Sequence, residues 1–281
     1  MNYRKKFIVR PGDKLKLADI DPAFKASEKS AETAAEAIET YRQRLSNLQK
    51  LLYAENQHAL LVVLQAMDAG GKDGTIGHVM GAWNPQGATV TSFKTPTPPE
   101  AAHDFLWRVH PHVPGRGEIA IFNRSHYEDV LVGRVHKLID KASCKRRYED
   151  ICAFEELLVG NATKIVKFFL HISKEEQLAR FEQRLDDPSR NWKISEADYK
   201  ERPYWDDYMD AYEDALNATS KKNAPWYVIP ANHKWFRNLA VSQILAETME
   251  DMHMHYPEPS VDLTEIRRQY HAALAKERSS S

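Results

Sequence analysis

The sequence predicts an α/β protein with three layers, in which helices cover both faces of a five-stranded parallel sheet. Short apolar runs rich in branched and aromatic residues alternate with longer helix-compatible stretches, and this is the order that a parallel sheet requires. Turn signals separate the stretches. The predicted strands are the run that begins at Ala59 and the runs 88–93, 118–123, 164–172 and 226–229.

The longest predicted helix covers about residues 30–55 and is expected to pack across the sheet. Its apolar residues recur at alternating spacings of three and four, which indicates one stripe along a helix. The stripe consists of Ile38, Tyr41, Leu45, Leu48 and Leu52. Further helices are expected at about 72–82, 100–109, 145–159, from 173 onwards, from 232 to about 255, and in the tail.

The bulk composition favours one main domain at 30–256, with an N-terminal arm at 1–29 and a C-terminal helical tail at 257–281. The first 26 residues show no sustained apolar period, so we expect an extended arm laid over the domain rather than a core element. No internal repeat, linker or low-complexity tract marks a second domain.

The charge balance and the cysteine count narrow the class of protein. The 281 residues carry 39 Lys and Arg against 40 Asp and Glu, a net charge of -1, so we expect neither nucleic acid nor a membrane as partner. No apolar run approaches the ~20 residues that span a bilayer, and the N-terminus lacks a signal-like apolar region. Cys144 and Cys152 are too few for a disulfide framework. These features predict a cytoplasmic location.

A glycine-containing turn follows the first strand and has the layout of a phosphate-binding loop. Glycine permits positive φ, so successive amides can converge on phosphate oxygens at a helix N-terminus. Against the pattern G-x-x-x-x-G-K-[ST], Ala66 replaces the first glycine and Asp73 replaces the hydroxyl residue. The alternative is an ordinary strand-to-helix turn. The predicted phosphate- or nucleotide-binding residues are Ala69, Gly70, Gly71, Lys72, Asp73, Gly74 and Thr75, together with Asn123 and Lys193 from later segments.

Asp68 is the unusual residue of this loop. A carboxylate inside an anion cradle repels the ligand unless a divalent cation or a transferable proton lies between them. Asp68 is therefore a candidate for metal binding or for catalysis. Because Asp73 stands where a hydroxyl usually helps to hold magnesium, metal binding is expected to shift to Asp68 and to acids elsewhere.

Polar residues also follow the third strand, where a phosphate-loop enzyme places a magnesium-binding carboxylate. Glu128 and Asp129 are the candidate metal ligands, Asp129 is also a candidate catalytic residue, and Arg124 is a candidate clamp on phosphate. The alternative is that the two acids only stabilise the first turn of a helix.

Two further segments are predicted to border the site. Arg180 and Arg184 lie one turn apart on a helix that leads into the polar segment 186–193, and the lid predicted at about 180–204 includes Lys193. Arginines at this spacing are also common as solvated partners of acids. The segment 95–99, rich in threonine and proline, follows the second strand and is either a substrate wall or a stiff lead into the next helix.

In combination, four motifs resemble those of the polyphosphate kinase 2 family. They are the segment 65–76, the segment Asn84-Pro85-Gln86-Gly87, the segment 122–130 with the sequence Phe-Asn-Arg-Ser-His-Tyr-Glu-Asp-Val, and the lid from Arg180 to Lys193. The resemblance implies a P-loop kinase fold, Mg²⁺ or Mn²⁺ as cofactor, inorganic polyphosphate as one substrate, and homodimers or homotetramers. It also implies AMP, ADP and ATP as nucleotides, with GMP and GDP as further candidates.

Asn123 stands where one branch of that family has aspartate, and the asparagine version resembles the branch that phosphorylates both AMP and ADP. We therefore expect polyphosphate-dependent phosphorylation of these nucleotides. The hypothesis places Lys72, Arg124, Arg180, Arg184 and Lys193 around the transferring phosphate, while Asp68 either orients or deprotonates the attacking phosphate or binds magnesium. The rival readings are an ATP-dependent nucleoside or nucleotide kinase and a non-catalytic polyphosphate- or nucleotide-binding protein.

Overall fold

A six-stranded sheet forms the centre of the computed structural model, which describes residues 1–26 and 30–279. The order of the strands is β1-β6-β5-β2-β4-β3, and all neighbours except β1 and β6 are parallel. All five predicted strands are present. The strand bounds are β1 Ile8–Val9, β2 Ala59–Ala66, β3 Ala88–Ser92, β4 Ile119–Asn123, β5 Thr163–His171 and β6 Trp226–Pro230.

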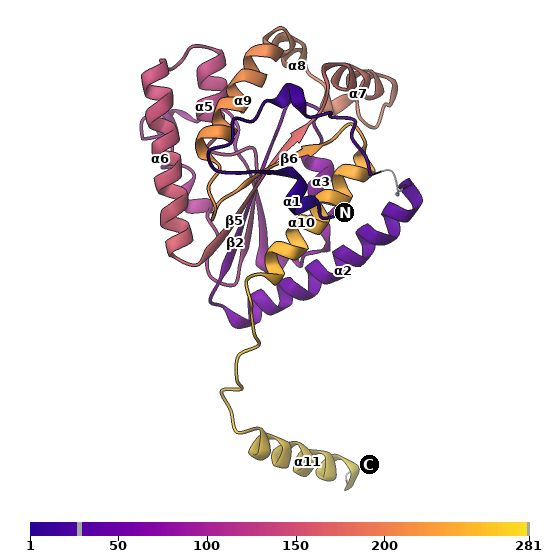
Figure 1. Cartoon of the computed structure of the whole chain (residues 1–281). Coiled ribbons are helices and arrows are strands. Elements are labelled where there is room, and N and C mark those ends of the chain that lie inside the picture. Colours follow the sequence, from indigo (N-terminus) through magenta and orange to yellow (C-terminus); the bar gives the residue numbers. More distant parts are fainter. Residues whose placement is uncertain (27–29, 280–281) are drawn as a thin grey trace.

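Helices cover both faces of the sheet and complete three layers (Figure 1). One side carries α2 (Ala31–Glu55), α3 (Lys72–His78) and α10 (Lys234–Glu250). The other side carries α5 (Glu128–Val135), α6 (Lys141–Gly160) and α9 (Trp205–Thr219). The predicted three-layer α/β architecture is therefore confirmed.

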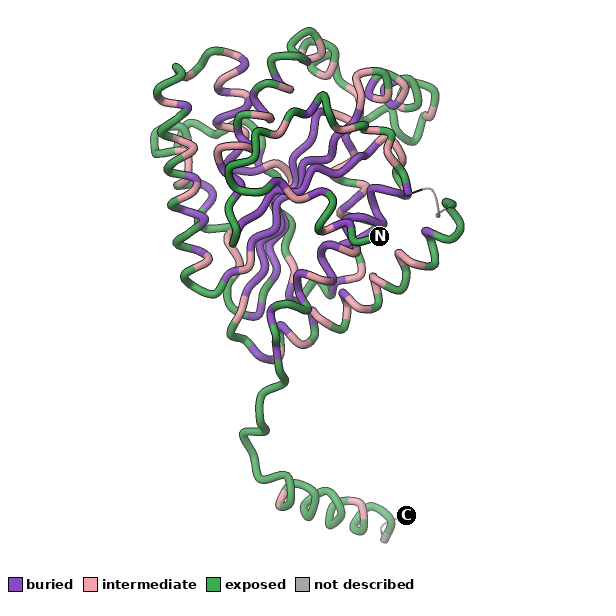
Figure 2. Tube along the Cα trace, in the orientation of Figure 1, coloured by how far each residue is buried: buried purple, intermediate pink, exposed green. Residues whose placement is uncertain are grey.

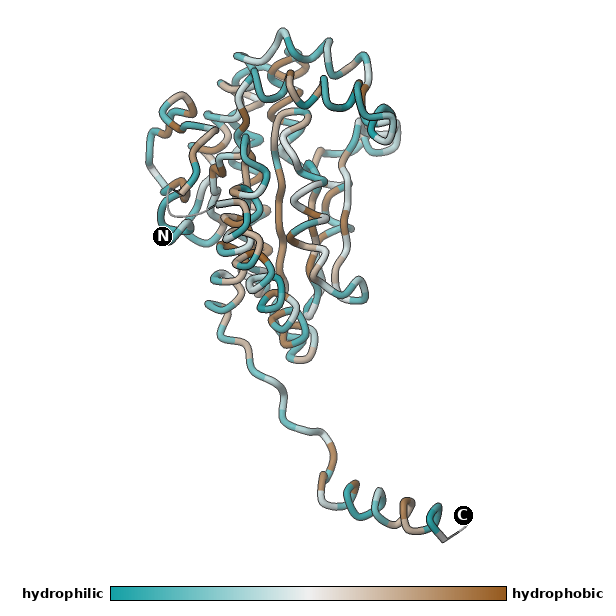
Figure 3. The backbone as a smooth tube through the Cα atoms, turned by 90° about the vertical axis from the view of Figure 1, so that its right-hand side faces the viewer, coloured by the Kyte–Doolittle hydropathy of each residue, from teal (hydrophilic) through white to brown (hydrophobic). Residues whose placement is uncertain are grey.

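The central strands are buried on both faces, which explains why their sequences are apolar runs without alternation. Every residue of β2 is buried, and only Asn123 of β4 is partly accessible. Figure 2 shows the buried strands inside an exposed shell, and Figure 3 shows the apolar strands between the two helical layers. This rigid sheet fixes the positions of the loops at its edge.

The helix α2 begins and ends close to the predicted residues. Ser30 and Thr33 form a capping box at its start, and Asn56 in the left-handed conformation ends it. Leu45 and Leu52 of the predicted stripe are fully buried. The helix packs mainly along α10, however, so the expected packing directly across the sheet is wrong.

The N-terminal segment contributes to the core, contrary to the expectation of an extended arm. It forms α1 (Tyr3–Phe7), and β1 then pairs antiparallel with β6 to make the sixth strand. Phe7 and Phe24 pack edge-on against Phe236 of α10. A two-residue strand is too short to show an apolar period, so the sequence pattern did not reveal it. Residues 27–29 of the predicted arm lie outside the described residues.

Several helices differ from the predicted lengths. The helix expected at 100–109 is reduced to α4 (Pro98–Ala101), and the one expected at 72–82 ends at His78 before a short 3-10 turn. The predicted lid region contains the end of α7 (Lys174–Asp186) and α8 (Glu196–Glu201).

The tail contains α11 (Leu263–Ser279), which stands away from the body of the molecule (Figure 1). This confirms one more helix after residue 257. Among the residues that the structure describes, no helix is both long and apolar enough to cross a membrane.

Candidate active site

The predicted phosphate loop connects the end of β2 to the start of α3, at the edge of the sheet where the parallel strands end. Gly71 has a φ of 102° and precedes the first residue of α3. A Cβ atom on Gly70 would lie 2.5 Å from the Cβ atom of Ala66 and 2.8 Å from the carbonyl oxygen of Met67. Both glycines are therefore required by the backbone path, and the first residues of α3, Lys72 to Gly74, line the cavity described below.

Lys72 places a largely buried ammonium beside the loop. Its Nζ donates to the carbonyl oxygen of Ala66 at 3.0 Å. Burial, followed by the charge of Arg124, lowers the pKa of Lys72. A bound anion would offset both effects, so the loop is set up to gain from phosphate.

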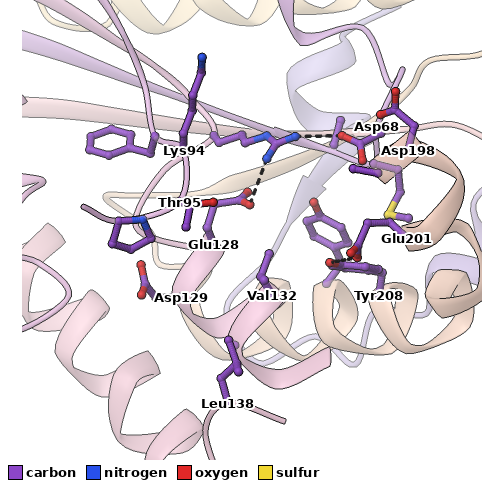
Figure 4. A pocket seen from close by; sticks show the side chains of 18 of the residues that line it. Asp68, Lys94, Thr95, Glu128, Asp129, Val132, Leu138, Asp198, Glu201 and Tyr208 are labelled. Atoms are coloured by element: carbon purple, nitrogen blue, oxygen red, sulfur yellow. Dashed lines mark hydrogen bonds and ion pairs between the residues drawn. The ribbon is translucent and has the colours of Figure 1, made fainter. Parts of the chain in front are cut away.

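Arg124 lies between two carboxylates at the centre of the site. Its Nη2 donates to Oδ1 of Asp68 at 2.9 Å, and its Nη1 lies 3.9 Å from Oε2 of Glu128. Figure 4 shows Asp68 and Glu128 reaching this guanidinium from different sides. Burial raises the pKa of Glu128, although the Arg124 and Lys72 charges oppose the shift. The structure thus brings these three predicted residues together.

Two non-glycine residues near this cluster have left-handed backbones. Ala69 has a φ of 58° and Arg124 a φ of 62°. Such conformations cost on the order of 1 kcal/mol each and persist where surrounding contacts fix them. The amide of Arg124 is fixed by a hydrogen bond to the carbonyl oxygen of Leu64 in β2.

The carboxylate of Asp129 does not lie with those of Asp68 and Glu128 around Arg124. Its carboxylate lies 3.7 Å from Arg108 and 3.7 Å from Arg147, and burial raises its pKa. Successive residues of a helix point about 100° apart, so Glu128 and Asp129 turn in different directions. The predicted convergence of Asp68, Glu128 and Asp129 is therefore wrong. Within residues 1–26 and 30–279, no group of three or more His, Cys, Asp or Glu side chains is placed to hold a metal.

Asn123 contacts the residue that replaces the usual hydroxyl of the loop. Its Nδ2 donates to Oδ1 of Asp73 at 2.9 Å. An aspartate at position 123 would instead place two carboxylates against each other. The side chain of Thr75, a predicted phosphate ligand, does not point into the cavity. It is fully buried, and its hydroxyl donates to the carbonyl oxygen of Gly71.

Two residues of α7 support the loop from the side. Gln177 donates to the carbonyl oxygen of Asp68 at 3.0 Å, and Arg180 donates to that of Ala69 at 2.8 Å. Arg180 also contacts Glu176 and the carbonyl oxygens of Ala231 and Asn232, so its donors are already used by protein acceptors. Arg180 is accordingly placed to position the loop.

Arg184 and Lys193 are brought together in the predicted lid. Nη1 of Arg184 donates to the carbonyl oxygen of Lys193 at 3.0 Å and lies 3.7 Å from Asp198. Both side chains line a cavity of about 970 Å³ that opens over the phosphate loop. The predicted lid residues therefore do border the loop.

This cavity is strongly basic. Nine lysine and arginine side chains line it against three aspartates, so it suits a ligand with several negative charges. The cations are Lys72, Lys94, Arg124, Arg180, Arg184, Arg190, Lys193, Lys234 and Arg237.

A second cavity of about 600 Å³ adjoins the first and shares six lining residues with it, among them Asp68 and Arg124. Its walls include apolar and aromatic side chains such as Val132, Leu138 and Tyr208, several of which Figure 4 shows around the opening. Thr95 lines both cavities, and Thr97 caps the start of α4 at Pro98, so the segment 95–99 borders the site and also leads into a helix. The site is thus two chambers joined where Asp68 and Arg124 meet.

Lys94, Tyr208 and Arg237 are among the lining residues that were not predicted as site residues. Lys94 directly follows the second strand, so its position at a strand end could have indicated it. Tyr208 of α9 lines the second cavity and donates to Glu201 at 2.7 Å. Arg237 lies in the first turn of α10, and nothing in its sequence context separates it from a solvated arginine.

Comparison with known proteins agrees with this geometry. The model of the family described as polyphosphate kinase 2 matches residues 27–257. An AMP/ADP-polyphosphate phosphotransferase of Meiothermus ruber is 52% identical over 256 residues, which cover 91% of this chain and 96% of that protein. An ADP-polyphosphate phosphotransferase of Rhodopseudomonas palustris is 48% identical, over 94% of this chain and 97% of that one.

Among solved structures, polyphosphate kinase 2 from Arthrobacter aurescens TC1 superposes with a TM-score of 0.93. It is 42% identical, and the match covers 97% of each chain. The sequence match, the fold and the paired chambers therefore agree, and the chain belongs to the polyphosphate kinase 2 family.

Proposed function

We propose that this chain transfers the terminal phosphoryl group of inorganic polyphosphate to AMP and ADP. The observation that carries the proposal is the junction of two different chambers at Asp68 and Arg124. A phosphoryl transferase needs its donor and acceptor to meet in line at one place, with positive charge around the transferring group. The names of the relatives at 52% and 48% identity support the same reaction.

The basic cavity over the phosphate loop is assigned to polyphosphate. Its excess of cations matches a chain that carries about one negative charge per phosphate unit, and the first-turn amides of α3 add fixed donors. The second cavity is assigned to the nucleotide, because its apolar and aromatic walls suit a base while Arg108 and Arg147 supply charge nearby.

In the proposed reaction, an oxygen of the nucleotide phosphate attacks the terminal phosphorus of polyphosphate. The bond from that phosphorus to the bridging oxygen breaks, and the shortened polyphosphate leaves with the electron pair. Arg124, at the junction, and Lys72, at the loop, screen the charge of the transferring group. Asp68 either orients the attacking phosphate or takes its proton.

We also propose Mg²⁺, or Mn²⁺, as cofactor. Asp68 and Glu128 would hold it, because both carboxylates reach the same point of the site, at the guanidinium of Arg124. A magnesium ion takes its other ligands from substrate phosphates and water. When bound, the metal would neutralise part of the phosphate charge.

The proposed acceptors include both AMP and ADP, with GMP and GDP as further candidates. ATP is formed when ADP is the acceptor, and the reverse reaction consumes it. The first relative is named for AMP and ADP and the second for ADP. The proposal also includes a homodimer or homotetramer, because the resemblance to the family implies one. A cytoplasmic location is part of it as well, since the free thiols of Cys144 and Cys152 suit a reducing compartment.

The test is product formation without any ATP at the start. Protein, Mg²⁺, polyphosphate and ADP are expected to yield ATP, and AMP in place of ADP is expected to yield ADP and then ATP. Formation of ADP only when ATP is supplied to AMP would favour an ATP-dependent kinase. Binding of both ligands with no turnover would favour a non-catalytic protein.

A further inference from the structure

Gln177 of α7 connects two segments that are distant in the sequence. Its Nε2 donates to the carbonyl oxygen of Asp68 at 3.0 Å, and its Oε1 accepts from Nη1 of Arg202 at 2.9 Å. Gln177 is only 2% exposed, so little water competes for these two hydrogen bonds. Arg202 directly follows α8 in the lid. Gln177 therefore joins the phosphate loop to the end of the lid.

The bond to Asp68 fixes a strained part of the loop. Ala69 has a left-handed φ of 58°, and the carbonyl oxygens of Asp68 and Ala69, on its two sides, accept from Gln177 and Arg180. A non-glycine residue keeps this conformation only where surrounding contacts hold it. The peptide plane held by Gln177 adjoins the carboxylate that contacts Arg124, so freedom of this plane would let the carboxylate shift.

The bond to Arg202 determines which end of the Gln177 amide faces the loop. A guanidinium carries donors and no acceptor, so only the amide oxygen can face Arg202. The amide nitrogen is then turned towards the carbonyl oxygen of Asp68, which can only accept. Nη1 of Arg202 also donates to the carbonyl oxygen of Lys174 in the first turn of α7, which holds the guanidinium in place. The two contacts of Gln177 are thus coupled through one amide.

The end of the lid is in turn attached to the wall of the second cavity. Glu201 accepts a hydrogen bond of 2.7 Å from the hydroxyl of Tyr208, a contact that Figure 4 shows. Glu201 and Arg202 line the second cavity, as Gln177 and Asp68 do. Gln177 and Arg202 do not line the basic cavity. The connection to Asp68 therefore runs from the side assigned to the nucleotide.

We infer that Gln177 is a positioning residue, which through Arg202 sets the orientation of Asp68 according to the position of the lid end. A nucleotide in the second cavity lies beside Glu201 and Arg202, so occupation of this cavity and alignment of Asp68 are linked. The inference rests on the proposed function and adds to it a connection between the acceptor site and the reaction centre. Gln177 acts on Asp68 and not on the reacting atoms.

The experiment is a double-mutant cycle on the full chain, with Gln177→Leu, Arg202→Met and the variant that carries both changes. Initial rates of ATP formation from polyphosphate at saturating ADP give kcat, and denaturant unfolding gives the stability of each variant. Gln177→Leu should lower kcat about tenfold, the size of one lost hydrogen bond, with the KM for polyphosphate unchanged. Arg202→Met should lower kcat about fivefold in wild type but less than about twofold in the Gln177→Leu background.

Gln243→Leu is the matched control. Gln243 of α10 also connects separate elements, because its Oε1 accepts from the amide of Tyr3 at 2.7 Å and its Nε2 donates to the hydroxyl of Tyr41 at 3.0 Å. It lines neither chamber, so this variant should lose stability with no change in kcat. The same result in Gln177→Leu, a loss of stability with wild-type kcat, would indicate a packing role and overturn the inference.

Two further outcomes would overturn the inference while leaving the proposed function intact. One is a pair of kcat losses that multiply in the variant with both changes, since Gln177 and Arg202 would then act independently. The other is wild-type kcat in Gln177→Glu, which keeps an acceptor for Arg202 but loses the donor to Asp68. If Gln177→Leu does not fold, Gln177→Glu replaces it in the cycle. A wild type that forms no ATP from polyphosphate would instead contradict the proposed function itself.

Discussion

Nη2 of Arg124 donates a hydrogen bond of 2.9 Å to Oδ1 of Asp68, and this contact joins the ends of two neighbouring parallel strands. Asp68 follows β2 and Arg124 follows β4, so the sheet register itself fixes their approach. The pair stands where the two chambers meet. An approaching phosphate therefore meets a guanidinium that already pairs with Asp68 and lies near Glu128, so phosphate must compete with these carboxylates for its donors.

The first prediction concerns Asp68. Asp68→Asn keeps the shape but removes the charge that orients the acceptor or holds the metal, so kcat should fall about a hundredfold, or ~3 kcal/mol. Asp206→Asn is a suitable control, because Asp206 is exposed on α9 and lines neither chamber. Both variants are compared by initial rates of ATP formation from ADP and polyphosphate. Near-normal turnover in Asp68→Asn would remove this residue from the mechanism.

The second prediction concerns Asn123. Asn123→Asp puts a carboxylate within hydrogen-bond distance of Asp73, and the repulsion should weaken anion binding beside the loop. The KM for polyphosphate should rise about tenfold at low Mg²⁺ and recover as Mg²⁺ is raised, because a cation can bridge two carboxylates. An unchanged KM at every Mg²⁺ concentration would show that the contact between Asn123 and Asp73 does not matter.

The third prediction uses the raised pKa of Glu128. Burial favours the neutral form, so ionised Glu128 costs stability once the pH exceeds the pKa of the unfolded chain. Glu128→Gln, which resembles the neutral form, should therefore be more stable than wild type at neutral pH, and the difference should vanish in acid. Its activity should be low at every pH. Thermal unfolding from pH 4 to 8 measures this; a variant less stable than wild type at neutral pH refutes the account.

The fourth prediction concerns a buried ion pair beneath the site. Nζ of Lys167 lies 2.5 Å from Oε2 of Glu155 and 3.0 Å from the hydroxyl of Tyr127, whose neighbour Glu128 borders the junction. Lys167→Met leaves a buried carboxylate without its cation and should cost roughly 3–5 kcal/mol.

The double variant Glu155→Leu with Lys167→Met removes both charges and should recover most of that loss. Denaturant unfolding of the two single variants and the double variant gives the coupling energy. Additive losses, with a coupling energy near zero, would mean that the pair does not act as a unit.

Local chemistry explains what could be predicted from the sequence. The loop at Gly71 and Lys72 is continuous in the chain. Asp68 and Arg124 lie within two residues of the ends of recognisable strands, so strand order alone brings them to one edge. Asp129 was misplaced because its direction depends on the exact rotation of α5, and adjacent helical residues diverge. Arg237 was missed because its burial arises from packing between α10 and α3, which are distant in sequence.

The structure of the N-terminal segment also could not be predicted from local sequence patterns. Its two-residue strand and short helix are stabilised by tertiary contacts, such as the pairing of Ile8 with Tyr227, rather than by any local period. Likewise, only the three-dimensional structure shows that the donors of Arg180 are already used by neighbouring acceptors.

The most direct test of the central claim is the rate of ATP formation from polyphosphate and ADP by wild type and Lys72→Ala, with no ATP added. The account predicts ATP formation by wild type and a rate at least about a hundredfold lower in the variant, with ADP binding retained, because Lys72 lies on the polyphosphate side. No ATP from the wild type, or an equal rate in Lys72→Ala, would contradict it.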